Sequence, residues 1–221
     1  MNDPRVLTLV GPAHAAVPIV LDSPHSGHRF PADFDAAVSE FDLRDGEDCF
    51  VDELYAPAGD LGIPLLAAQL PRTYLDANRH CGDIDLELLE GGHWPHEWVP
   101  SGKAAIGKAL LWRTLDDGRV IDRRKLTVAE VRRRIAAFHA PYHRALQQLL
   151  ALAGRADAPA RRVGRLGEIF GAGSERPGHQ NPNVTPAEKA LMLPDSSSPF
   201  LLYLLLLKSQ TTSIDVVLVS L

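Results

Sequence analysis

Apolar residues form two short, nearly continuous stretches in the N-terminal half, at 17–22 and 63–70. Stretches of this length without alternation are typical of strands that are covered on both faces. Between them, the segment 45–55 carries apolar side chains at helical spacing. The order strand, helix, strand predicts an α/β fold with a mainly parallel or mixed central sheet flanked by helices.

A second helical pattern occupies the segment 127–154. Its apolar stripe consists of Val131, Ile135, Phe138, Tyr142, Leu146 and Leu149. Thr127 and Glu130 have the spacing of a capping box at its start. Pro141 lies inside the pattern and should kink or split the helix, because proline lacks the backbone N–H and crowds the preceding turn.

The regular patterns stop near Gly154. The following residues are rich in Pro, Gly and Arg without a sustained period, which predicts loop or disorder. We therefore divide the chain into an α/β domain, 1–154, and an atypical tail, 155–221. The apolar stretch 199–207 in the tail has nine residues before Lys208, whereas a membrane-spanning helix needs about 20. We expect no membrane segment.

Composition limits the kinds of partner. The 221 residues are 45% apolar, which is enough for one core. Twenty-three basic and 28 acidic side chains give a net charge of −5 and are interspersed, so nucleic acid and membrane surfaces are not expected partners. The N-terminus lacks a secretory signal pattern, and Cys49 and Cys81 form no paired motif. These features predict a cytoplasmic protein that acts on a small molecule.

His25 is the first candidate for chemistry. It follows the stretch 17–22 in the sequence DSPHSG, where Ser26 and Gly27 allow a tight turn. A histidine at the end of a buried strand is well placed to act as a metal ligand or a general base. The alternative is a loop histidine that bonds a backbone carbonyl.

Acidic residues gather at the start of the segment 45–55. They are Asp45, Glu47, Asp48, Asp52 and Glu53. The helix dipole favours acidic residues in a first turn, so they need no further role. Alternatively, Glu47 or Asp48 joins His25 in a zinc site, since such sites commonly combine histidine with a carboxylate. The spacing does not choose between these readings.

Asn78 and Arg79 follow the second strand in the sequence DANR. The guanidinium fork beside an amide suits the binding of a substrate carboxylate. The alternative is an arginine that pairs with Asp76 or Asp83. The nearby His80, Cys81, His93 and His96 match no closed structural zinc site.

The segments DSPHSG, GEDCFVDELY and RTYLDANR, in this order, resemble the N-formylglutamate amidohydrolase family. GKALLWR and FHAPYHRAL resemble the next segments of that family, so the resemblance covers about residues 17–150. It implies a fold similar to the zinc carboxypeptidases and aspartoacylases, with zinc at the strand ends. It also implies that His25 is the first zinc ligand and Glu47 the second, with Asp48 as the competing choice. Asn78 and Arg79 would hold a substrate carboxylate.

The resemblance implies hydrolysis of N-formyl-L-glutamate to formate and L-glutamate, the last step of one route of histidine degradation. Zinc suits this reaction because it polarises an amide carbonyl and lowers the pKa of a bound water to about 7. Two alternatives remain open. The chain could deacylate another N-acyl amino acid, or it could be a non-catalytic remnant that binds carboxylates.

The tail departs from the family. Members of the family continue with a strand that ends in His-Ser and supplies the remaining zinc ligand, and later with a glutamate that resembles a general base. Neither is recognisable in 155–221. We therefore expect that a frameshift or insertion replaced this part, that zinc binds weakly and that solubility is poor. The sequence leaves open the third ligand, the general base, the oligomeric state and whether this chain is active.

Overall fold

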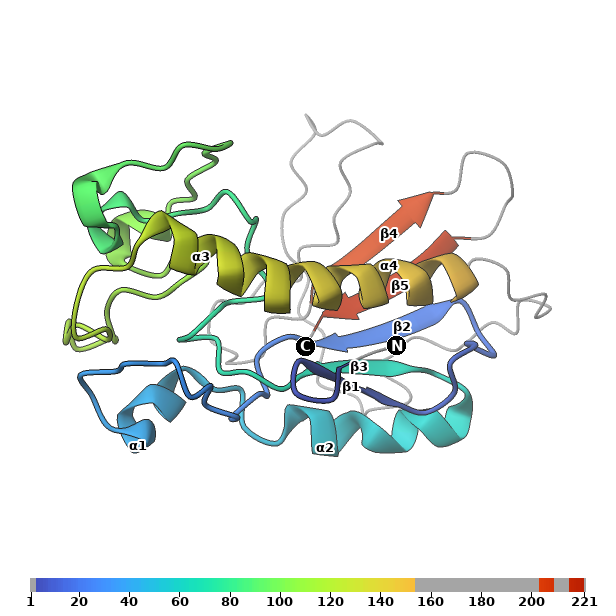
Figure 1. Ribbon diagram of the computed structural model, residues 1–221. Coiled ribbons are helices and arrows are strands. Elements are labelled where there is room, and N and C mark those ends of the chain that lie inside the picture. The colour runs from blue at the N-terminus through green and yellow to red at the C-terminus, as the bar shows by residue number, and fades with distance from the viewer. Residues whose placement is uncertain (1–2, 154–202, 209–214, 221) are drawn as a thin grey trace, which may run out of the picture.

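The computed structural model describes residues 3–153, 203–208 and 215–220 (Figure 1). Its strands are β1 (Leu7–Val10), β2 (Ile19–Ser23), β3 (Leu65–Ala68), β4 (Tyr203–Lys208) and β5 (Asp215–Ser220). Its α-helices are α1 (Glu40–Leu43), α2 (Val51–Tyr55), α3 (Val128–Arg134) and α4 (Ala140–Ala153). None of the described helices has both the length and the apolar character needed to cross a membrane.

The strands form one mixed sheet in the order β1-β3-β2-β5-β4. β2 runs parallel to both neighbours, β3 and β5, while β1 and β4 pair antiparallel at the two edges. The expected α/β class and mixed sheet are therefore confirmed. The similarity to zinc carboxypeptidases stays a prediction.

Three strands were not expected from the sequence. β1 precedes both apolar stretches, and β4 and β5 lie in the tail that we expected to be loop or disorder. β5 extends the sheet because it pairs parallel with β2, from Ile19 opposite Val217 to Asp22 opposite Ser220. The other residues of the tail lie outside the described part of the chain.

Both faces of the central strands are covered. On one face, Val20 of β2 and Leu66 of β3 pack with Tyr142, Leu146 and other residues of α4. On the opposite face, Leu21 and Leu65 pack with Tyr55 and Ala58, and Figure 1 shows α2 on the side of the sheet away from α4. The nearly continuous apolar stretches of the sequence therefore arise from burial on two sides.

The expected helix from Asp45 to Tyr55 is shorter than its pattern. It begins only at Val51, because Phe50 adopts a left-handed conformation with φ 62°. Residues Arg44–Gly46 form a separate 3₁₀ turn, and Glu47 is extended. This bend returns the chain to the end of β2, where the Asp48 N–H donates to the carbonyl oxygen of His25 at 3.1 Å.

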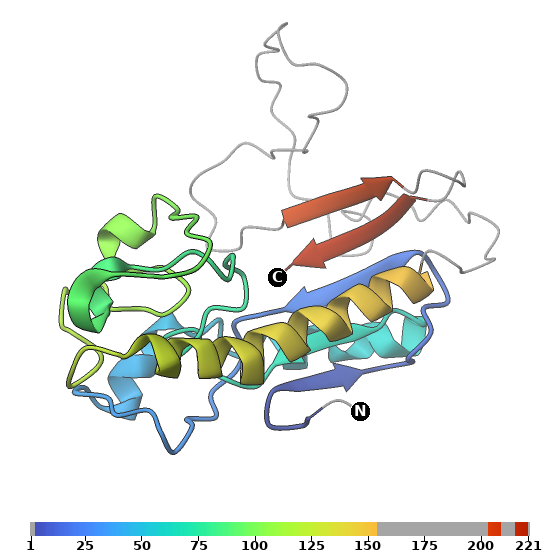
Figure 2. The same ribbon diagram turned by 45° about the horizontal axis from the view of Figure 1, so that its top comes forward.

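The long C-terminal helical pattern is present with one irregularity. Thr127 and Glu130 form the expected capping box. Pro141 does not split the helix. Instead a π-helical turn, Ile135–His139, joins α3 to α4, and the ribbon continues through it in Figure 2. A π turn before a proline changes the hydrogen-bond pattern at the point where the proline cannot donate.

Gly27 lies where two backbones almost touch. A Cβ atom at this position would lie 2.3 Å from the carbonyl oxygen of Leu70 and 2.4 Å from the carbonyl carbon of Gln69. Since both atoms belong to backbone just beyond β3, neither can move without disturbing the strand end. We expect Gly27→Ala to lower the free energy of unfolding, measured by urea denaturation, by about 3 kcal/mol.

Gly102→Ala is the matched control for this prediction. A Cβ atom there would meet nothing within 4 Å, so its free energy of unfolding should stay within about 0.5 kcal/mol of the unaltered protein. Equal urea midpoints for the two variants would contradict the close approach at Gly27.

Candidate active site

The candidate site lies where β2 and β3 end. Because the two strands are parallel, their carboxyl ends meet at the same edge of the sheet. The turn after β2 carries His25, and the Arg29 N–H ties this turn to the Gln69 carbonyl beyond β3 at 2.9 Å. Residues Arg72 to Arg79 follow on the β3 side. The sequence prediction of a site at the strand ends agrees with this arrangement.

His25 is buried between two carboxylates. Its Nδ1 lies 3.1 Å from Oδ2 of Asp48, and its Nε2 lies 2.8 Å from Oδ1 of Asp76. Burial by itself lowers the pKa of His25, but the bonds to Asp48 and Asp76 outweigh it, so the pKa is raised above its ordinary value. His25 is therefore not the carbonyl-bonded loop histidine of the alternative reading.

Asp76 is fully buried and links several groups. Its Oδ1 accepts from His25 and from the N–H of Asn78 at 2.9 Å. Burial raises the pKa of Asp76, but the bond from His25 and the nearby positive charges lower it to about 2. Its Oδ2 has no hydrogen-bond partner and lies 3.6 Å from Arg72 and 3.8 Å from Arg79. Sequence reasoning did not name Asp76 among the candidate metal ligands.

The structure brings Asp48, and not Glu47, to His25. The carboxylate of Glu47 pairs with Nε of Arg44 at 2.7 Å and lies 3.7 Å from Nδ1 of His28. The pair that sequence reasoning preferred, His25 with Glu47, is therefore not joined. The competing pair, His25 with Asp48, is joined by the contact of 3.1 Å. Within the described residues, no group of three or more His, Cys, Asp or Glu side chains is arranged to hold a metal.

Asn78 and Arg79 stand on a tight turn beside His25. The Arg79 N–H donates to the carbonyl of Asp76 at 3.2 Å, which closes the turn. Arg79 donates from Nε to the Lys108 carbonyl at 3.3 Å and from a terminal nitrogen to the Asn78 carbonyl at 3.2 Å. The side chain of Asn78 is exposed. The structure thus places Asn78 and Arg79 beside Asp76 and His25, and their role in binding a carboxylate stays a prediction.

Two histidines, one in the π turn and one in α4, bond the backbone of this turn. Nε2 of His139 lies 2.8 Å from the Arg79 carbonyl, and Nε2 of His143 lies 2.9 Å from the Ala77 carbonyl. Because a carbonyl only accepts, each Nε2 carries the proton. Burial and the neighbouring His143 lower the pKa of His139 to about 4, and burial lowers the pKa of His143. Sequence reasoning missed this role, although their spacing of four residues places both on one helix face.

The same helix also holds β2. The hydroxyl of Tyr142 donates to the buried carboxylate of Asp22, three residues before His25. Arg72 completes the site from the β3 side, since it lies 3.6 Å from both Asp48 and Asp76 and stacks over the ring of Trp112 at 5.1 Å. No sequence signal separated Arg72 from an ordinary surface arginine.

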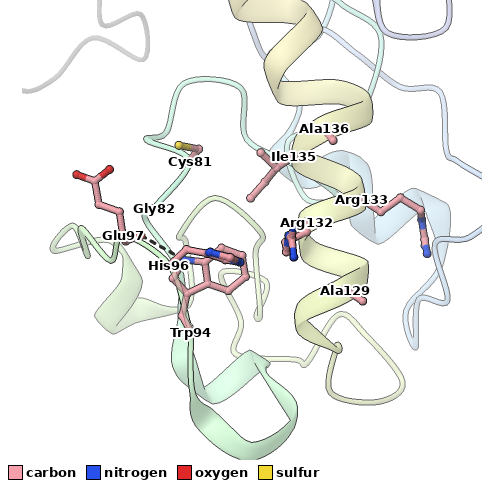
Figure 3. Close-up of a pocket in the computed structure, with 10 residues that line it drawn as sticks. All are labelled: Cys81, Gly82, Trp94, His96, Glu97, Ala129, Arg132, Arg133, Ile135 and Ala136. Carbon is pink, nitrogen blue, oxygen red and sulfur yellow. Dashed lines mark hydrogen bonds between the residues drawn. The ribbon is translucent and has the colours of Figure 1, made fainter.

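A separate open pocket of about 600 Å³ shares no lining residue with this cluster. It is lined by Cys81, Gly82, Trp94, His96, Glu97, Ala129, Arg132, Arg133, Ile135 and Ala136 (Figure 3). Trp94 packs edge-to-face with His96 and donates to the Glu97 carbonyl at 3.2 Å. Two of the clustered residues from the sequence, Cys81 and His96, therefore lie in this pocket and not beside His25.

Comparisons with known proteins show which family the chain is similar to. The family model described as N-formylglutamate amidohydrolase matches residues 17–161. Among solved structures, the chain is similar to the crystal structure of N-formylglutamate amidohydrolase from Ralstonia eutropha JMP134, with 46% sequence identity and a TM-score of 0.64. The match covers 67% of this chain and 53% of that one, so the chain spans about half the length of this relative. No curated protein matches the chain.

The neutral state of His139 makes stability depend on pH. The folded pKa is about 4, against 6.5 for the group without its surroundings. As the pH falls, the unfolded chain binds the proton first. The contribution of His139 is therefore complete above pH 6.5 and is lost between pH 6.5 and 4. We expect this loss to be about 2 kcal/mol in urea unfolding experiments.

His139→Gln is the control, because an amide can still donate to the Arg79 carbonyl but does not titrate. The unfolding free energy of this variant should fall less steeply over the same pH range. His143 remains in both proteins, so the difference between them isolates His139. Parallel pH curves for the two proteins would contradict the assignment.

Proposed function

Because the chain belongs to the N-formylglutamate amidohydrolase family, we propose that it hydrolyses N-formyl-L-glutamate to formate and L-glutamate with the help of zinc. The observation that carries the proposal is that the candidate metal donors lie next to the candidate carboxylate fork. His25 contacts Asp48 on one side and the buried carboxylate of Asp76 on the other, and Asp76 also accepts from the N–H of Asn78, beside Arg79.

The donors fit zinc in part. An imidazole and a carboxylate are two of the ligand types that catalytic zinc sites combine. Nδ1 of His25 and Oδ2 of Asp48 lie 3.1 Å apart, close to the spacing of two ligands that each lie about 2 Å from one zinc ion. Asp76 occupies the place behind the imidazole where ligating histidines usually have a carboxylate partner. The described residues supply no third ligand.

Each side chain then has a separate task. Asp76 fixes the ring of His25 through Nε2, which leaves Nδ1 directed to the side of Asp48. Asn78 and Arg79 bind one carboxylate of the substrate and so orient the formamide. Bound zinc would polarise the formamide carbonyl and make a bound water more acidic. None of the described residues is assigned as the general base.

The proposal extends to the setting of the reaction. Cys49 and Cys81 are free and exposed, which suits the reducing cytoplasm. Formation of glutamate there fits the last step of a histidine-degradation route. We also propose that the sheet is that of the zinc carboxypeptidases, because the strand ends carry both the donors and the carboxylate fork.

Formate release from N-formyl-L-glutamate is the direct test. With zinc in excess, the purified chain should release formate, and a chelator should stop the reaction. Arg79→Met should raise KM by about 10- to 100-fold, because a charged hydrogen-bonded partner of the substrate is lost. Faster hydrolysis of another N-acyl amino acid would favour the deacylase alternative. Ligand binding without any hydrolysis would favour the carboxylate-binding remnant.

Zinc affinity separates the two possible carboxylate ligands. Asp48→Asn should weaken zinc binding by at least about 100-fold, since a direct ligand matters more than the second shell. Glu47→Gln should leave the affinity nearly unchanged, because its carboxylate pairs with Arg44. Titration of the metal-free protein with zinc measures both. The reverse order of effects would restore Glu47 as the ligand.

A further inference from the structure

We propose that Lys108 binds the second carboxylate of the substrate and so makes the site selective for an acidic side chain. The inference rests on the proposed function, since it concerns the same substrate. Lys108 begins the segment KALLWR after Gly107, and its side chain is only 9% exposed. Its ammonium group lies 3.7 Å from the centre of the Trp112 ring. A buried ammonium group needs an anionic partner to offset its lost hydration.

Lys108 adjoins the carboxylate fork. Its carbonyl oxygen accepts a hydrogen bond from Nε of Arg79 at 3.3 Å. Its ammonium group and the guanidinium of Arg72 stack on the same indole, that of Trp112. Arg72 in turn lies 3.6 Å from Asp48 and from Asp76. Lys108 therefore contacts Arg79 through its backbone carbonyl, and its ammonium group is linked to Asp48 and Asp76 through Trp112 and Arg72.

Buried polar atoms without hydrogen bonds gather at this place. The described residues contain seven such side-chain atoms. Five belong to the cluster and are Nε of Arg72, Oγ1 of Thr73, Oδ2 of Asp76, Nζ of Lys108 and Nε1 of Trp112. Buried polar groups in folded proteins nearly always have partners. Three of the five atoms can only donate, so the missing partner is an acceptor, and a carboxylate has the right chemistry.

The present partner of Lys108 is easily displaced. Oδ1 of Asp116 lies 3.0 Å from Nζ, but the carboxylate is 75% exposed and the contact lacks hydrogen-bond geometry. Ion pairs with an exposed member contribute little. Arg72 is a weaker candidate for this role, because Asp48 and Asp76 already occupy its guanidinium. A substrate carboxylate would take the place of Asp116 on Lys108.

The test compares two ligands that differ only in charge. Binding of N-formyl-L-glutamate and of N-formyl-L-glutamine is measured by calorimetry on the full chain, with metal chelated so that no turnover occurs. The unaltered chain should prefer the glutamate compound. Lys108→Met should weaken that binding by about 30-fold and change glutamine binding by less than about threefold, because one charged hydrogen bond is lost. Lys108→Arg should retain most of the preference.

Asp116→Asn provides a second, independent measurement, because this exposed substitution leaves the fold untouched. Removing the competing carboxylate should tighten binding of the glutamate compound by about two- to threefold. Equal weakening of both ligands in Lys108→Met, or unchanged binding in Asp116→Asn, would overturn the role of Lys108. A Lys108→Met variant that still prefers the glutamate compound over the glutamine compound would also overturn this role. Failure of formate release with intact, Lys108-dependent binding would instead count against the proposed function alone.

Discussion

The site depends on the two contacts that the buried imidazole of His25 makes with Asp48 and Asp76. The imidazole joins three separate segments, because its own turn follows β2, Asp48 comes from the bend before α2 and Asp76 follows β3. A carboxylate as deeply buried as Asp76 is costly unless charged or donating groups surround it. His25, Arg72 and the Asn78 N–H supply that surrounding. The buried charge of Asp76 is stabilised by these three groups together.

The helix that follows the site is as important as the strands before it. Tyr142 bonds the strand that leads to His25, while His139 and His143 bond the turn that carries Arg79. These bonds from one helical segment thus hold the end of β2 and the turn of Asn78 and Arg79 in place relative to each other. The π turn ahead of Pro141 belongs to this helix, and such turns often accompany functional sites. His139 and His143 each use Nε2–H to donate to a backbone carbonyl, so the neutral form of each imidazole is sufficient for these bonds.

The sequence predicted the ends of β2 and β3 and the position of His25 beyond β2, because nearly continuous apolar stretches and turn residues are local signals. It did not separate Glu47 from Asp48, because these residues are adjacent. In the folded chain the carboxylate of Asp48 contacts His25, while that of Glu47 pairs with Arg44. The roles of Arg72, Lys108 and His143 depend on contacts between residues distant in the chain. No local pattern encodes such contacts.

Asp76 connects His25, a proposed metal donor, to the turn that carries the proposed carboxylate fork of Asn78 and Arg79. One of its oxygens faces His25 and also accepts from the Asn78 N–H, so the donor pair and the carboxylate fork cannot move independently. The other oxygen lies between Arg72 and Arg79 without a hydrogen bond. Any ligand that draws Arg79 toward itself changes the charge balance around Asp76, and Asp76 orients His25. Under the proposed function, substrate binding at the fork would therefore be coupled to the candidate metal donors through the buried carboxylate of Asp76.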